Sequence, residues 1–174
     1  MDVSTNIAQP SDGSAEETIP VIGFGRRLIA TLIDAILLAF LSFLVAFVIG
    51  FVGIFVQMYN PYEPLPLAPL IVICSVVLSV IYYVGAWSKT GQTLGKTLVG
   101  IKVVSKDGSG LSGGKAFLRY IGYIISGIIL SIGFIWVAFD SKRQGWHDKI
   151  AGTYVVYVED KFSGADAVEF VPSD

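Results

Sequence analysis

Two long runs of apolar residues constrain this chain more than any other feature. Residues 28–56 (LIATLIDAILLAFLSFLVAFVIGFVGIFV) contain one charged side chain, Asp34, and residues 67–87 (LAPLIVICSVVLSVIYYVGAW) contain none. A helix needs about 20 predominantly apolar residues to cross the hydrocarbon core of a bilayer, and each run is long enough. The sequence therefore predicts two transmembrane helices, joined by the short connection QMYNPYEPLP at residues 57–66.

The composition and a third apolar run extend this prediction. Of the 174 residues, 53% are hydrophobic and 15% are charged, whereas soluble domains carry roughly a quarter of charged residues. The third run, residues 116–139, contains Arg119 and is interrupted by Gly122, Gly127 and Gly133. We expect an all-α membrane protein with two transmembrane helices, a third apolar segment that is re-entrant or spanning, and a small cytoplasmic β element.

The distribution of lysine and arginine predicts the orientation in the cell membrane. The connection 57–66 has neither residue, whereas five lysines lie between the second and third runs. Cytoplasmic loops carry an excess of positive charge, so we expect a multi-pass protein with a cytoplasmic N-terminus. A full crossing by the third run would place Lys142, Arg143 and Lys149 outside, which favours a re-entrant or interfacial segment.

The ends of the chain are acidic and polar, which divides it into three parts. Residues 1–22 and 159–174 are predicted to be disordered tails, and residues 23–158 a membrane domain. Two β-rich runs lie in the predicted cytoplasmic parts: TLVGIKVVSKDGSGLS, at residues 97–112, and TYVVYV, at residues 153–158. We expect them to pair into a small sheet on the inner face of the membrane.

The sequence GKT at residues 95–97 resembles part of a phosphate-binding loop. That loop requires G-x-x-x-x-G-K-[ST], but the position of its first glycine is occupied by Thr90. The loop should also join a buried strand to a long helix, and the apolar surroundings do not predict that fold. We therefore interpret this stretch as a cytoplasmic loop between membrane elements.

Asp34 is the residue in the apolar runs that most suggests chemistry. Acids inside a membrane segment usually face a cavity or a partner because a buried charge there is costly. Arg27 lies seven residues earlier, about 10 Å along a helix and on nearly the same face, and Arg26 precedes it. Two hypotheses stay open: Asp34 is a protonatable or cation-binding carboxylate, or it forms a structural pair with Arg27. Arg119, Lys115 or Lys96 could also reach it in a packed bundle.

A second charged segment, FDSKRQGWHDKIAGT at residues 139–153, follows the third apolar run. His147 beside Asp148 could relay protons near neutral pH. Alternatively, Trp146 and the neighbouring cations could anchor the chain at the lipid head groups. One histidine and one cysteine argue against zinc, and no nucleophile–base pair or cofactor loop is evident, so we expect neither an enzyme nor a cofactor. Nothing indicates nucleic acid as a partner.

Three stretches together resemble the RDD family of integral membrane proteins: GFGRRLIATLIDAILL, KTGQTLGKTLVGIKVVSKDG and FDSKRQGWHDKIAGTYVV. The family is named for one arginine and two aspartates. The resemblance assigns the arginine to Arg27 or the adjacent Arg26, the first aspartate to Asp34, and the second to Asp148, with Asp140 as the other candidate. It covers about residues 23–156.

The resemblance implies a limited set of functions. Members of the family are proposed to be transporters, some are linked to sodium/proton exchange, and a eukaryotic relative is linked to assembly of a membrane protein-quality-control complex. We expect transport of a small ion or solute, possible partners being Na⁺ and H⁺, with Asp34 as carrier and His147 with Asp148 as cytoplasmic gate. The alternative is a non-transporting scaffold. Because two or three helices cannot enclose a polar path alone, transport requires a homo-oligomer or a membrane-protein partner.

Overall fold

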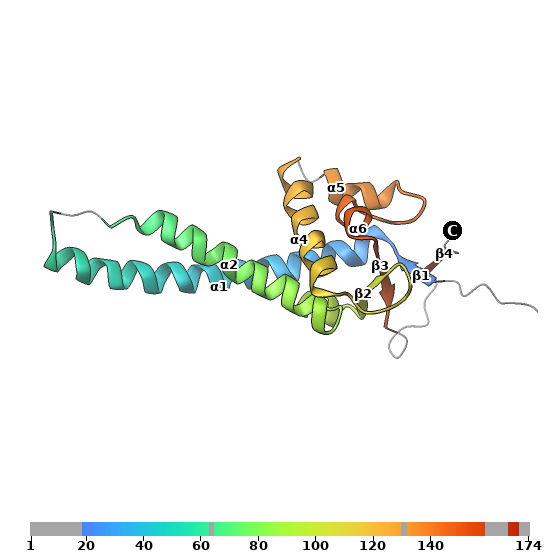
Figure 1. The fold of residues 1–174 in the computed structure, drawn as a ribbon, viewed down its shortest axis with the longest axis horizontal. Helices are drawn as coiled ribbons and strands as arrows, with labels where there is room; N and C mark the ends of the chain where they lie inside the picture. Colours follow the sequence, from blue (N-terminus) through green and yellow to red (C-terminus); the bar gives the residue numbers. More distant parts are fainter. Residues whose placement is uncertain (1–18, 63–64, 130–131, 159–166, 171–174) are drawn as a thin grey trace, which may run out of the picture.

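The computed structural model describes residues 19–62, 65–129, 132–158 and 167–170. The fold consists of two long helices with a group of shorter helices and strands packed at one end of them (Figure 1). We use "the cap" for every element except the two long helices. The two long helices are α1 (Phe24–Tyr59) and α2 (Leu67–Lys89). The cap contains β1 (Ile19–Ile22), α3 (Leu94–Leu98), β2 (Ile101–Ser105), α4 (Gly113–Ile128), α5 (Ile132–Ile135), the 3-10 helix η1 (Trp136–Ala138), α6 (Trp146–Ala151), β3 (Thr153–Tyr157) and β4 (Ala167–Phe170).

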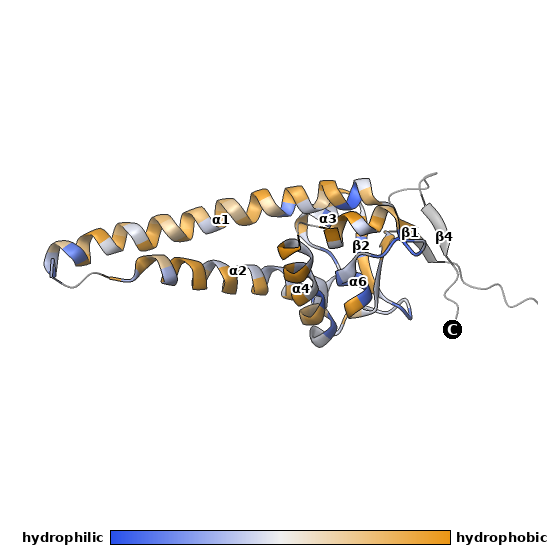
Figure 2. Ribbon diagram, turned by 90° about the horizontal axis from the view of Figure 1, so that it is seen from above, coloured by the Kyte–Doolittle hydropathy of each residue, from blue (hydrophilic) through white to orange (hydrophobic). Residues whose placement is uncertain are grey.

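The helices α1 and α2 form a hairpin, and apolar residues predominate along both helices (Figure 2). Both are long and apolar enough to cross a membrane, as the sequence predicted. At 1.5 Å per residue, the 36 residues of α1 extend about 54 Å and the 23 of α2 about 35 Å. A ladder of exposed aromatic rings runs along α1, with centroids 6.3 Å apart between Phe47 and Phe51 and 5.0 Å apart between Phe51 and Phe55. Such a surface requires lipid or another apolar surface around it.

The third apolar run does not form one straight helix. The axes of α4 and of the helical piece formed by α5 and η1 differ in direction by 112°. Helix α4 runs steeply across the hairpin axis (Figure 1), so its arrangement fits the re-entrant or interfacial form that we favoured.

The two faces of α4 reverse the pattern of a soluble helix. Arg119, Tyr120 and Ser126 are buried against the rest of the protein. The opposite face is apolar and at least one-third exposed; it comprises Phe117, Leu118, Ile121, Ile124, Ile125 and Ile128. Because this outer face is apolar, it suits contact with lipid or another apolar surface better than contact with water.

The cap contains an antiparallel sheet with strand order β2-β3-β1-β4. The predicted pairing of the two β-rich runs is confirmed, with Ile101 opposite Tyr157 and Ser105 opposite Thr153. Each predicted tail contains one short strand: β1 lies within residues 1–22 and β4 within residues 159–174, and the two pair with each other. The acidic character of the tails concealed short apolar stretches, and Val21 is completely buried. The other tail residues lie outside the described ones.

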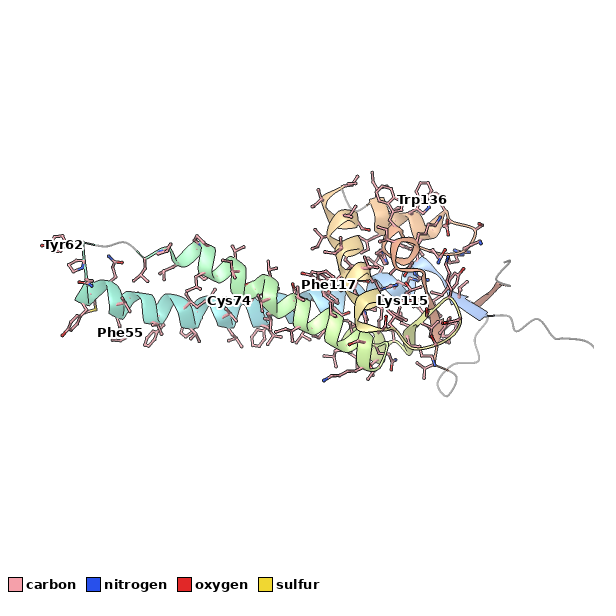
Figure 3. The ribbon with its side chains drawn as sticks, viewed as in Figure 1. Phe55, Tyr62, Cys74, Lys115, Phe117 and Trp136 are labelled. Carbon is pink, nitrogen blue, oxygen red and sulfur yellow. The ribbon has the colours of Figure 1, made fainter. Side chains whose placement is uncertain are left out.

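The core of the cap fixes its position at the end of the hairpin. Trp87, near the end of α2, is fully buried together with Ile101 and Val103 of β2 and Val155 of β3. The tip of the hairpin, with Tyr62, lies at the far end from this core, and Trp136 lies at the outer edge of the cap (Figure 3). The polar residues singled out in the sequence are gathered at the end of the hairpin that carries the cap.

Candidate functional site: a buried charge cluster beside an apolar pocket

Asp148 is the centre of the charged cluster. Its side chain is completely buried, and its Oδ2 lies 2.6 Å from Nη1 of Arg27 on α1. Arg119 of α4 binds Oδ1, and the backbone N–H of Gly145 donates to Oδ2 at 3.0 Å. Burial opposes ionisation, but the positive charges of Arg119 and then Arg27 outweigh it and hold the pKa of this carboxyl well below its usual range. One carboxylate therefore joins α1, α4 and α6.

The alternative residues that the sequence left open occupy different places in the structure. Arg27, not Arg26, reaches the cluster, because the guanidinium of Arg26 lies over the ring of Tyr157, 4.9 Å from its centroid. Asp148, not Asp140, is the aspartate that meets Arg27. Asp140 lies apart from the cluster and is paired with the ammonium of Lys149.

Asp34 has a different set of partners from those the sequence suggested. The hydroxyls of Tyr82 and Thr93 donate to its two oxygens at 2.6 and 2.5 Å, and the backbone N–H of Gly95 donates at 2.8 Å. Its side chain is almost completely buried. The hypothesis of an Arg27–Asp34 pair is wrong, because seven residues of helix separate the two and Arg27 turns to Asp148 instead.

Asp34 lies in the first third of α1. The part of α1 that follows it, residues 35–59, extends about 37 Å, which is enough to cross the roughly 30 Å hydrocarbon core without it. Asp34 therefore lies toward the end of α1 that carries the cap, where α2 and α3 supply its partners. Its cost of burial is met by three hydrogen-bond donors.

The GKT stretch performs a structural task at this point. A Cβ at Gly95 would lie 2.1 Å from the carbonyl oxygen of Ala30 and 2.9 Å from Oδ1 of Asp34, so only glycine allows α3 to approach α1 this closely. The Gly95 N–H that would face a phosphate in a nucleotide loop faces the Asp34 carboxylate instead. The interpretation as a loop between membrane elements holds, with the addition that residues 94–98 form a short helix.

His147 is buried among aromatic rings beside Asp148. Its Nε2 lies 3.6 Å from Oδ2 of Asp148, and its ring centroid lies 4.4 Å from that of Tyr123 and 5.2 Å from that of Phe134. Burial disfavours the charged imidazolium and lowers the pKa to about 3, despite the neighbouring Asp148. His147 is therefore neutral at pH 7, which argues against a proton relay near neutral pH.

Lys96 is the residue that sequence reasoning undervalued. Its side chain is 2% exposed, and its ammonium lies 5.9 Å from the centroid of the Trp87 ring. Within the described part of the chain the ammonium makes no ion pair or side-chain hydrogen bond. No linear signal marks this lysine as buried, because its burial depends on α3 folding back onto α1.

A cavity of about 430 Å³ adjoins the cluster. Its volume lies within the range of small-molecule sites. Four of its lining residues carry basic groups, namely Arg27, Lys96, Arg119 and His147. The remaining wall is largely apolar and includes Phe24, Leu28, Phe134, Ile135 and Val137.

The fold and the site together define a class of protein. It is an integral membrane protein with an apolar helical hairpin and a cap that contains a buried charge cluster. Comparison with known sequences is then specific. The chain belongs to the RDD family, whose model matches residues 21–152.

Two relatives from Bacillus subtilis (strain 168) cover most of the chain. The uncharacterized protein YxaI is 40% identical over 149 residues, which is 78% of this chain and 96% of YxaI. The uncharacterized protein YckC is 29% identical over 143 residues, covering 78% of this chain and 83% of YckC. A shorter match, 37% identical over 65 residues, covers 37% of this chain and 26% of the proline-rich antigen of Mycobacterium leprae (strain TN). No solved structure matches the chain significantly.

Proposed function

We propose that this protein binds a small anion, or the anionic group of a larger molecule, in the pocket of the cap, and that the hairpin anchors this pocket at the cytoplasmic side of the cell membrane. The observation that carries the proposal is an imbalance of buried charge. Among the described residues, three buried cations, Arg27, Lys96 and Arg119, stand against two buried carboxylates, Asp34 and Asp148. A buried charge without a partner is costly, so an anion in the pocket would lower the free energy of the folded state.

The charges and hydrogen-bond donors around Asp34 and the pocket argue against sodium/proton exchange through Asp34. A sodium ion is bound by oxygen lone pairs, but the three groups nearest Asp34 direct hydrogens at it. The charged side chains that line the pocket, Arg27, Lys96 and Arg119, are all cationic, and they repel a cation. Antiport of Na⁺ and H⁺ is therefore the weaker hypothesis, and the small solute of our transport hypothesis becomes an anion.

Whether the bound anion is moved or held depends on the assembly. The described residues of the hairpin midsection, 36–56 and 67–78, carry no ionisable side chain except the cysteine at position 74, so one copy offers no polar path across the bilayer. Transport would need several copies or another membrane protein packed on the exposed apolar face of α1. A scaffold that uses this face to bind other membrane proteins would need no path, and both forms are compatible with an anion site in the cap.

Thermal unfolding in neutral detergent tests the proposal. Phosphate, sulfate and a short-chain alkyl carboxylate are compared with Na⁺, K⁺ and Li⁺ as chloride salts at equal ionic strength. An anion at 100 times its Kd stabilises the folded state by about 2.7 kcal/mol, which raises Tm by roughly 5 to 10 °C for a chain of this length. We expect this shift with at least one of the anions, and a much smaller one in Lys96→Met.

Lys89→Met is the matched control, since it removes one positive charge from the exposed end of α2 without touching the pocket. The proposal fails if no anion stabilises wild type, or if both variants respond as wild type does. Sodium/proton exchange would be favoured instead if proteoliposomes showed a Na⁺-dependent pH change that a folded Asp34→Asn variant abolished.

A further inference from the structure

The pocket that our proposed function assigns to an anion has two chemically different parts. Arg27, Lys96 and Arg119 contribute the cationic part, and Phe24 and Val137 belong to the apolar wall. An inorganic anion would leave this apolar wall in contact with nothing but solvent. A molecule with one anionic group and an apolar body would use both parts of the pocket.

The pocket reaches the protein surface among residues that face lipid. Leu28 of α1 is 43% exposed and Ile135 of α5 is 46% exposed, and both line the cavity. Their neighbours Ile29 and Trp136 are exposed apolar side chains as well. Trp136 stands at the outer edge of the cap (Figure 3), where an indole suits the head-group region. An occupant that arrives from the bilayer therefore meets no polar barrier at this edge.

The charge imbalance sets the charge of the occupant. Because the buried cations exceed the buried carboxylates by one, a single negative charge balances the site. A phosphodiester carries one negative charge at neutral pH, and its oxygens suit guanidinium donors. Nη2 of Arg27 and Nε of Arg119 are buried and make no hydrogen bond within the described residues, so a phosphate could bind these donors only after the guanidinium groups shift toward the pocket. A zwitterionic lipid would bring its own cation and leave the imbalance in place.

From these observations we infer that the pocket holds the phosphodiester of an anionic phospholipid, with its acyl chains leaving between α1 and α5 past Leu28 and Ile135. The inference rests on the proposed function and narrows it to a lipid ligand. Lys96 is the residue on which lipid binding depends most, since Arg27 and Arg119 are already paired with Asp148.

The test is a titration of the full chain, purified in neutral detergent, with dioctanoyl phosphatidylglycerol, dioctanoyl phosphatidylcholine and glycerol 3-phosphate, followed by Tm. Phosphatidylglycerol should raise the Tm of wild type at concentrations at least tenfold below those of the other two compounds. In Lys96→Met its apparent affinity should fall at least tenfold, and in the control Lys89→Met it should stay within twofold. Without lipid, Lys96→Met should have a stability close to that of wild type, because the ammonium makes no ion pair or hydrogen bond among the described residues. Lys96→Gln serves as a second variant if the methionine does not fold.

The outcomes separate the lipid inference from the proposed function. Equal stabilisation by glycerol 3-phosphate and phosphatidylglycerol would overturn the lipid inference and leave the anion site standing. Stabilisation by phosphatidylglycerol that neither substitution of Lys96 weakens would place the lipid elsewhere and also overturn the inference. No response to either anionic compound would overturn both.

Discussion

Lowering the pH from 7 to 5 should destabilise this protein through a single residue. The chain has one histidine, His147, and burial lowers its pKa to about 3, against about 6.5 in an unfolded chain. Between these values the unfolded chain binds more protons than the folded protein, so stability falls as the pH falls below 6.5. The expected loss from pH 7 to pH 5 is about 2 kcal/mol. The low pKa of Asp148 adds its own loss only below about pH 4.

The assay is unfolding by SDS in mixed micelles at pH 7, 6 and 5, followed by tryptophan fluorescence, for wild type and His147→Gln. Wild type should lose about 2 kcal/mol of unfolding free energy, and the variant should lose less than about 0.5 kcal/mol because it has no group that titrates in this range. The charges near His147 are Asp148, Arg119, Arg27 and Lys96, and none of them titrates from pH 5 to 7 when unperturbed. A wild type with constant stability, or a variant with the same loss as wild type, would refute the reasoning.

Two further predictions concern packing and surface charge. Gly95→Ala should destabilise the folded protein by about 1 to 3 kcal/mol, since the added Cβ would lie 2.1 Å from the carbonyl oxygen of Ala30. Gly127→Ala is the control, because no atom lies within 4 Å of the Cβ that it adds. In the same SDS titration it should be neutral or stabilise the protein by up to about 1 kcal/mol. Lys149→Ala breaks the pair with Asp140 at a site where the lysine is 46% exposed, so the loss should stay below about 1 kcal/mol, and a larger loss would show that Asp140 belongs to the cluster.

The hairpin and the main strand pairing could be predicted from sequence because their signals are local. Twenty or more consecutive apolar residues specify a membrane helix whatever lies around them, and β-branched runs such as residues 101–105 and 153–157 are recognisable alone. Residues 19–22 were missed as a strand, since four residues beside an acidic tail carry little pattern of their own. The strand forms only by pairing with β3 and β4, which lie far along the chain.

The sequence identified most residues of the candidate site, but it did not predict which of them pair with each other. Arg27, Asp34, Arg119 and Asp148 stood out because charge in or beside an apolar run is costly. Helix spacing suggested that Arg27 meets Asp34, whereas its partner Asp148 lies 121 residues away. A single sequence contains no signal for that distance. The burial of Lys96 likewise follows from α3 folding back through Gly95.

The most direct measurement is a crystal structure with rubidium bromide in place of sodium chloride, with anomalous data collected at the absorption edges of both ions. The account predicts a bromide peak, or density for a bound phosphate group, in the pocket lined by Lys96, Arg27 and Arg119, and no rubidium at Asp34. A rubidium peak at Asp34 beside a pocket without an anion would contradict it and identify a cation site instead.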